Sequence, residues 1–101
     1  MYASITRATR PTRENMAEEG VMVGETMVTW LRDVEGFEGF LLLTDEETGG
    51  VQVIALWESR EIAEHHRAAR ARLRERISET AGVELGETVG FDVPYSWFKS
   101  G

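Results

Sequence analysis

The chain has 101 residues, of which 42% are hydrophobic and 29% charged, with a formal net charge of −7 and no cysteine. This length suits one domain over residues 1–101, because two independent cores would not fit. The acidic balance argues against duplex nucleic acid as a partner, since that binding depends on basic side chains. Without cysteine there is no disulfide, thiolate nucleophile or Cys-ligated metal.

The apolar runs are far shorter than the roughly 20 residues that cross a bilayer. The first sixteen residues also lack the apolar core of a secretory signal. We therefore expect a cytoplasmic protein that makes no membrane contact.

The first half of the chain predicts a strand followed by a helix. Residues 2–10 are rich in β-branched side chains and are closed by a proline, which indicates a strand. A helix is predicted over residues 13–34 with Thr12 as its N-cap. Gly20 and Gly24 weaken that helix by about 1 kcal/mol each relative to Ala. Its apolar or small residues recur at spacings of four and three: Met16, Gly20, Val23, Met27, Trp30 and Val34.

A hairpin is predicted after this helix, and Gly36 is expected to end the helix. Its strands cover residues 40–44 and 51–57, and the sequence DEETGG forms the turn. The second strand is apolar on both sides, which is typical of a strand covered on both faces of a sheet. One side carries Val51, Val53, Ala55 and Trp57, and the other carries Ile54 and Leu56.

A second helix is predicted from Ser59, its N-cap, to Gly82. The apolar stripe of this helix consists of Ile62, His66, Ala69, Leu73 and Ile77. The last strand is predicted over residues 88–98, at an edge or with a bulge because Pro94 lacks a backbone donor. Its residues Val89, Phe91, Val93, Tyr95 and Trp97 are expected on one face.

The resulting order, βαββαβ, indicates a ferredoxin-like α+β fold, with two helices on one face of a four-stranded antiparallel sheet. The other face is then bare, although the strand over residues 51–57 is apolar on both sides. A second copy of the same sheet is the simplest cover, because monomers seldom expose large apolar patches. The sequence therefore predicts a homodimer.

Three stretches resemble the antibiotic biosynthesis monooxygenase family of dimeric α/β barrels: VEGFEGFLLL, VIALWESREIAEHH and VGFDVPYSWFKS. With the order of elements, the resemblance covers nearly the whole chain. It implies that two such domains pair into a dimeric α/β barrel. The family includes cofactor-independent oxygenases of phenols or quinols, haem-degrading monooxygenases and proteins of no known activity, so the fold does not settle the function.

The haem-degrading branch of that family has an Asn on the first strand, a Trp early in the second helix and an axial His about ten residues further on. The matching positions of this chain hold Thr6, His66 and Arg76. This departure argues against haem degradation.

The two histidines offer the main candidate chemistry. His65 and His66 point about 100° apart on a helix, so they do not share a metal as residues four apart do. We expect no metal site and no cofactor. His66 lies on the apolar stripe and has two interpretations: a core or pocket-edge histidine bonded to a neighbour, or a cavity-lining base that takes a proton from a phenol.

Four further residues are candidates for substrate binding. The resemblance places Thr6 on the helix-facing side of the first strand, and Trp57 and Phe91 are either core aromatics or a platform for a flat apolar substrate. On an edge strand, Phe91 is equally suited to seal a dimer contact. Arg70 follows one turn after His66, either in a solvated charged face or as an anion site. The resemblance thus implies an oxygenase of a small aromatic substrate held between helices and sheet. A non-catalytic binding module and a purely structural dimer remain as alternatives.

Overall fold

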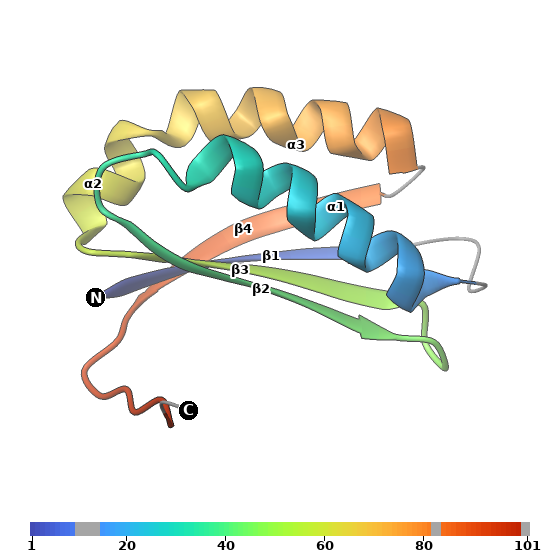
Figure 1. Cartoon of the computed structure of the whole chain (residues 1–101), viewed down its shortest axis with the longest axis horizontal. Coiled ribbons are helices and arrows are strands. Elements are labelled where there is room, and N and C mark those ends of the chain that lie inside the picture. The colour runs from blue at the N-terminus through green and yellow to red at the C-terminus, as the bar shows by residue number, and fades with distance from the viewer. Residues whose placement is uncertain (10–14, 82–83, 100–101) are drawn as a thin grey trace.

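The computed structural model describes residues 1–9, 15–81 and 84–99 of the chain. Its strands are β1 (Tyr2–Thr9), β2 (Phe37–Asp45), β3 (Gly50–Trp57) and β4 (Glu84–Asp92). They form one antiparallel sheet in the order β2-β3-β1-β4. The helices are α1 (Met16–Leu31), α2 (Arg60–His65) and α3 (Arg67–Ala81). All three lie on the same side of the sheet (Figure 1), which confirms the ferredoxin-like α+β prediction.

The register of the sheet decides which side chains face the helices. Thr6 of β1 lies opposite Val53 of β3, and Val53 packs against the hydrophobic core. Directly opposed residues in an antiparallel pair project to the same face. Thr6 therefore faces the helices, as predicted, while its neighbour Arg7 is exposed on the other side.

Trp57, at the end of β3, is the centre of the core. It is fully buried, with 0% of its surface exposed. Its indole Nε1 donates a hydrogen bond to Ser4 Oγ at 3.3 Å, which satisfies the one polar group of a buried tryptophan. The ring of Phe37 meets it edge-on at 5.5 Å between centroids. The other buried members of this cluster are Met27, Leu31, Ala55 and Ala63.

Helix α1 is shorter than predicted. It begins at Met16 behind a left-handed Asn15 (φ 56°) whose side chain makes no capping bond. The proposed cap, Thr12, lies outside the described residues. The helix ends at Leu31 rather than at Gly36, whose φ of 84° instead turns the chain into β2.

The apolar stripe predicted for α1 was wrong at one position. Trp30 is 54% exposed, and Leu31 takes the buried place. The exposed Trp30 ring is instead met by Arg76, whose guanidinium carbon lies 5.5 Å from the ring centroid. Such a cation–π contact keeps the indole at the surface, where its face meets a cation from α3.

The second helix begins as predicted but is not continuous. Ser59 is its N-cap, because the Ser59 Oγ accepts a hydrogen bond from the Ile62 amide at 3.3 Å. The helix is interrupted at His66, whose φ of −95° and ψ of 10° depart from helical values. The predicted end at Gly82 lies outside the described part of the chain.

The last strand is shifted from its predicted range of residues 88–98. It spans Glu84–Asp92 and lies at an edge of the sheet, as Pro94 indicated. The Val93 amide donates to the Met1 carbonyl at 3.0 Å, and pairing stops there because the next residue, Pro94, has no amide hydrogen. Tyr95 and Trp97 therefore do not share the strand face of Phe91.

The sheet surface opposite the helices, called here the back face, carries apolar side chains on all four strands, and Arg7 and Gln52 also lie on it. Its register brings together Ala3, Ile5, Leu41, Leu43, Ile54, Leu56, Val89 and Phe91. No described helix lies on this side (Figure 1). Within the described residues, none of the helices is long and apolar enough to span a membrane.

Candidate functional site

His66 lies at the junction of α2 and α3, directly against the core tryptophan. Its ring stacks on Trp57 with centroids 6.0 Å apart and planes at 18°. The ring of His65 meets that of His66 edge-on, with centroids 5.0 Å apart and planes at 83°. His66 is half-buried and His65 is exposed. The break in the helix therefore holds one imidazole at the rim of the core.

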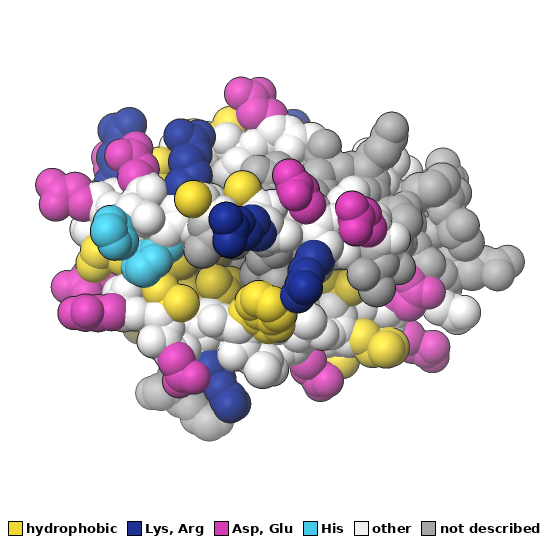
Figure 2. Space-filling view, turned by 90° about the horizontal axis from the view of Figure 1, so that it is seen from above, with side chains coloured by type: hydrophobic (Ala, Val, Ile, Leu, Met, Phe, Trp, Pro, Cys, Tyr) yellow, Lys and Arg dark blue, Asp and Glu magenta, His cyan; other side chains and the backbone are white. Residues whose placement is uncertain are grey.

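Figure 2 views the molecule from the side of the helices. The two histidines lie together near one end, next to hydrophobic side chains that continue between the charged ones. On α2, Arg60 Nε donates to Glu64 Oε1 at 3.1 Å. This hydrogen bond and the Glu64 charge raise the pKa of Arg60. The charged residues of α2 thus include an intrahelical ion pair on an exposed surface, which agrees with a solvated face.

Hydroxyl groups line the helix-facing side of β1 and β4. The Oγ1 atoms of Thr6 and Thr88 are hydrogen-bonded at 2.8 Å across the two strands. Ser4 lies opposite Ala55 and accepts from Trp57, so it faces the same way. The Tyr2 hydroxyl lies over Gly90, where a Cβ atom would collide with it. Together these form a hydroxyl row, Tyr2, Ser4, Thr6 and Thr88, that can donate to or accept from the oxygens of a ligand.

The structure brings only some of the predicted site residues together. Thr6, Trp57 and His66 lie on the helix side of the sheet or against it. Phe91 belongs to the back face and is 55% exposed. The sheet therefore separates Phe91 from the others, and one ligand between helices and sheet does not reach it. Arg70 lies in α3, one turn after His66, but its side chain is outside the described part of the structure.

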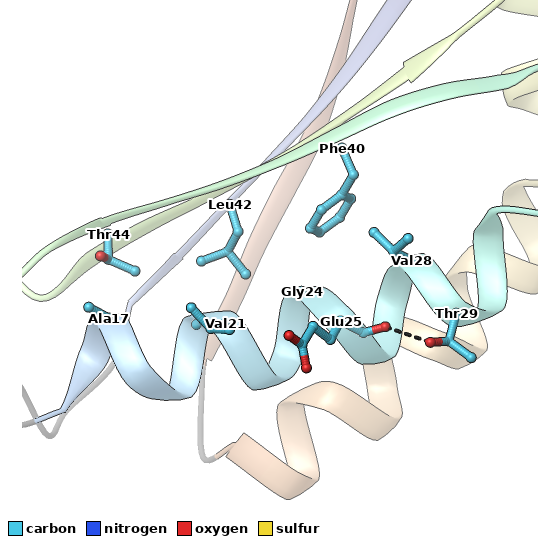
Figure 3. A pocket seen from close by; sticks show the side chains of 10 residues that line it. Ala17, Val21, Gly24, Glu25, Val28, Thr29, Phe40, Leu42 and Thr44 are labelled. Atoms are coloured by element: carbon cyan, nitrogen blue, oxygen red, sulfur yellow. Dashed lines mark hydrogen bonds between the residues drawn. The ribbon is translucent and has the colours of Figure 1, made fainter. Parts of the chain in front are cut away.

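A cavity of about 710 Å³ lies elsewhere, between α1 and the helix-facing side of β2 (Figure 3). We call it the α1–β2 groove. Gly20 and Gly24 form part of its helix wall: a Cβ at Gly20 would lie 3.1 Å from Leu42 Cδ2, and one at Gly24 would lie 3.7 Å from Phe40 Cε1. Because these two positions have no side chain, the helix lies close to β2 and the groove between them is not filled. The lining is Ala17, Gly20, Val21, Gly24, Glu25, Val28, Thr29, Phe40, Leu42 and Thr44.

The α1–β2 groove was not predicted, although the sequence contains a signal for it. Two glycines four apart fall on one face of a helix, and the alternation of Phe40, Leu42 and Thr44 places these three on one face of a strand. Glu25 is the ionisable residue of the lining, and its carbonyl accepts a hydrogen bond from Thr29 Oγ1 at 2.8 Å. The predicted residues Thr6, Trp57 and His66 do not line this groove.

Comparison with known proteins rests on structure, because no protein-family profile and no curated protein matches the sequence. Similar solved structures include a monooxygenase from the gene ActVA-Orf6 of Streptomyces coelicolor in complex with nanaomycin D. That structure has a TM-score of 0.73 and 18% identity, and the match covers 98% of this chain and 92% of that one.

Two further solved structures have the same architecture. The first, SnoaB of Streptomyces nogalater, is a cofactor-independent oxygenase with a TM-score of 0.65, 16% identity and 94% coverage of both chains. The second, an antibiotic biosynthesis monooxygenase, has a TM-score of 0.62 and 17% identity, with 92% of this chain and 98% of that one covered. The sequence resemblance is thereby confirmed at the level of the fold. This chain has the antibiotic biosynthesis monooxygenase fold.

Proposed function

We propose that the protein is a cofactor-independent monooxygenase of a small phenol or quinol held between the helices and the sheet, with His66 as the base. The observation that carries this proposal is the half-buried His66 ring stacked on the buried Trp57. The hydroxyl row faces the same layer, and its Ser4 accepts a hydrogen bond from Trp57. Similarity in fold to a cofactor-independent oxygenase supports the class of reaction.

The reaction needs a base and a place for a flat ring. His66 takes the phenolic proton, because an imidazole ring nitrogen can accept a proton and return it later in the reaction. The phenolate then reacts with O2, and one oxygen atom enters the ring while the other leaves as water. A phenol thus becomes a quinone, and the substrate supplies all four electrons that O2 accepts. Thr6 and its neighbours in the hydroxyl row hold the substrate oxygens.

The proposal includes a homodimer formed through the back face. Leu41 and Leu43 on β2 are 47% and 46% exposed, and Val89 and Phe91 on β4 are also exposed. A sheet with such a face packs against another sheet at about 10 Å, and burial of its apolar side chains is the driving force. A two-fold dimer uses the same patch on both subunits.

The experiment that tests the catalytic proposal compares His66→Ala with its exposed neighbour, His65→Ala. Oxygen uptake is followed for a panel of hydroquinones, and ligand binding is followed by thermal stabilisation. We expect His66→Ala to lower kcat by about 10²- to 10⁴-fold, the usual contribution of a general base. His65→Ala is expected to stay within about twofold of the wild type, since a general-base contribution belongs to the inward ring. Equal uptake by all three proteins contradicts the proposal.

Non-catalytic binding is the second candidate, and one observation favours it. The α1–β2 groove offers volume, but His66 is not part of its lining. A protein that holds an apolar molecule in this groove has no histidine base beside the ligand. Saturable thermal stabilisation by a hydroquinone without oxygen uptake, unchanged in His66→Ala, supports this candidate over the oxygenase.

A further inference from the structure

Trp30 and Arg76 form an exposed contact between α1 and α3 that the proposed reaction does not use. The guanidinium carbon of Arg76 lies 5.5 Å from the centre of the Trp30 ring. Trp30 is 54% exposed, and Arg76 is exposed as well. The core does not need the Trp30 ring, because Met27 and Leu31 take the buried places in this part of α1. We call Trp30 and Arg76 the Trp–Arg pair.

The guanidinium of Arg76 has no carboxylate partner in the described part of the chain. Glu75 and Glu79 are described residues of the same helix, and neither forms an ion pair with it. By contrast, Arg60 of α2 donates to Glu64 at 3.1 Å. Arginine presents a planar fork of N–H donors that binds a carboxylate through two parallel hydrogen bonds. The donors of Arg76 can therefore bind an anion from outside the chain.

The charges of the helix layer favour an anion at this place. Helix α3 carries five arginines and two glutamates, a formal charge of +3, whereas α1 carries three glutamates and no basic residue. The whole chain has a formal net charge of −7, which repels anions from most of its surface. An acidic ligand therefore approaches the helix side of the molecule through α3.

The indole of Trp30 restricts where the guanidinium lies. A free arginine side chain loses rotational freedom when it binds, and this loss weakens an exposed ion pair. A guanidinium held over an aromatic ring is restricted before a ligand arrives, while the N–H groups at its edge stay accessible. The indole also offers an apolar face next to the cation. The Trp–Arg pair thus suits a ligand that has both a flat apolar part and a carboxylate.

The Trp–Arg pair lies on the same side of the molecule as His66. The C-terminal end of α1, which carries Trp30, and the start of α3, next to His66, lie at the same end of the helix layer (Figure 1). Figure 2 shows hydrophobic side chains that extend from the two histidines along this surface, beside Lys or Arg side chains. Arg76 follows His66 by about 15 Å of helical rise. Helical side chains point back toward the N-terminus, so the guanidinium and the imidazole are on the order of 10 Å apart.

We infer that the substrate of the proposed reaction carries a carboxylate, which Arg76 binds with two hydrogen bonds while Trp30 packs against the apolar part of the same molecule. The inference rests on the proposed oxygenase and adds a requirement for its substrate. Because the base and the cation are on the order of 10 Å apart, a further ring or a chain of similar length separates the phenolic ring from the carboxylate. Arg76 binds the remote end of the substrate and determines specificity, and Trp30 is its positioning residue.

Calorimetric titration tests the preference for a carboxylate with two ligands of the same shape. The probe is a biphenyl that has two hydroxyl groups para to each other on one ring and a carboxylate at the far end of the other ring. The neutral carboxamide of this molecule is the comparison. We expect the wild type to bind the carboxylate at least about tenfold more tightly, and Arg76→Gln to bind the two ligands within about twofold of each other. Equal binding of both ligands by the wild type overturns the inference.

Arg72→Gln is the matched control for the lost charge. Arg72 is exposed on the same helix, one turn before Arg76, and the contact with Trp30 is made by Arg76. General attraction by a second exposed charge is screened by salt, so this variant should lower the carboxylate affinity by no more than about twofold. An equal loss in the two variants indicates attraction without a defined contact and overturns the inference.

Two substitutions of Trp30 test its role as the positioning residue. Trp30→Ala should reduce the preference for the carboxylate to about threefold or less, because the guanidinium is no longer held over a ring. Trp30→Phe keeps an aromatic face and should retain most of the preference. A full preference in Trp30→Ala contradicts the positioning role.

Oxygen uptake separates this inference from the proposed oxygenase. With the carboxylate as substrate, Arg76→Gln should raise KM at least about tenfold and leave kcat within about threefold, because a remote contact is made equally in the ground and transition states. His66→Ala should lower kcat for both ligands. Uptake that depends on His66 but shows no preference for the carboxylate contradicts only the inference. A preference that Arg76→Gln removes, in a protein that takes up no oxygen, contradicts the oxygenase and supports the carboxylate site.

Discussion

Gly36 is the position at which a single added methyl group should be most informative about the fold. Its φ of 84° lies in the left-handed region, and an added Cβ would lie 2.7 Å from both Cδ1 and Cγ2 of Ile62. For Gly36→Ala the left-handed backbone costs about 1–2 kcal/mol, and the steric overlap costs about 1–3 kcal/mol. The lower entropy of the unfolded Ala chain acts in the opposite direction and offsets about 0.4–1 kcal/mol of this cost. We therefore expect Gly36→Ala to lower the free energy of unfolding by about 2–4 kcal/mol.

Urea unfolding followed by circular dichroism measures this loss. The unfolding entropy of a 101-residue domain is about 0.2 kcal/mol/K, so the melting temperature should fall by roughly 10–20 °C. The steric part is isolated by Ile62→Ala, which removes both close carbon atoms. Ile62 is half-buried, and we expect its truncation alone to cost about 1–2 kcal/mol.

The double variant Gly36→Ala/Ile62→Ala decides between the two causes. Its loss should be smaller than the sum of the single losses by about 1–3 kcal/mol, the steric part, while the backbone part remains. Additive losses would refute the steric reasoning. A Gly36→Ala protein that melts within about 2 °C of the wild type would refute the strained turn itself.

Two further changes test local structure with opposite signs. Ser59→Ala removes the acceptor for the Ile62 amide, so it should cost about 1 kcal/mol in urea unfolding, whereas Ser59→Asp should keep most of the capping and serves as the control. Gly24→Ala should raise the free energy of unfolding by up to about 1 kcal/mol, because Ala is the better helix former. The added Cβ would lie at an ordinary contact distance of 3.7 Å from Phe40 Cε1. A loss of stability in this variant would contradict the described helix packing.

The fold was predictable from local patterns. Alternating apolar residues in strands and three-to-four spacing in helices gave the order of elements, and this order specifies the ferredoxin-like arrangement. The Ser59 cap was also found, since a short hydroxyl side chain before a helix has one dominant local use. The helix-facing orientation of Thr6 came from strand alternation combined with the family resemblance.

The ends of elements were less predictable because tertiary contacts set them. Neither glycine nor proline marks the break at His66, which coincides with stacking on Trp57 from a distant strand. Trp30 fits the periodic stripe of α1, yet a guanidinium on α3 meets it at the surface. Such contacts join residues far apart in the sequence, and a local pattern carries no information about them.

By itself the sequence determined the order of the strands and helices and most of the residues on their apolar sides, because side-chain periodicity is a local property. Only the tertiary structure decided how these sides meet. It placed Phe91 across the sheet from Thr6 and Trp57, and it opened the α1–β2 groove away from His66. The pairing of strands and the packing of helices fix those distances, since a site consists of groups that the chain brings together only after it folds.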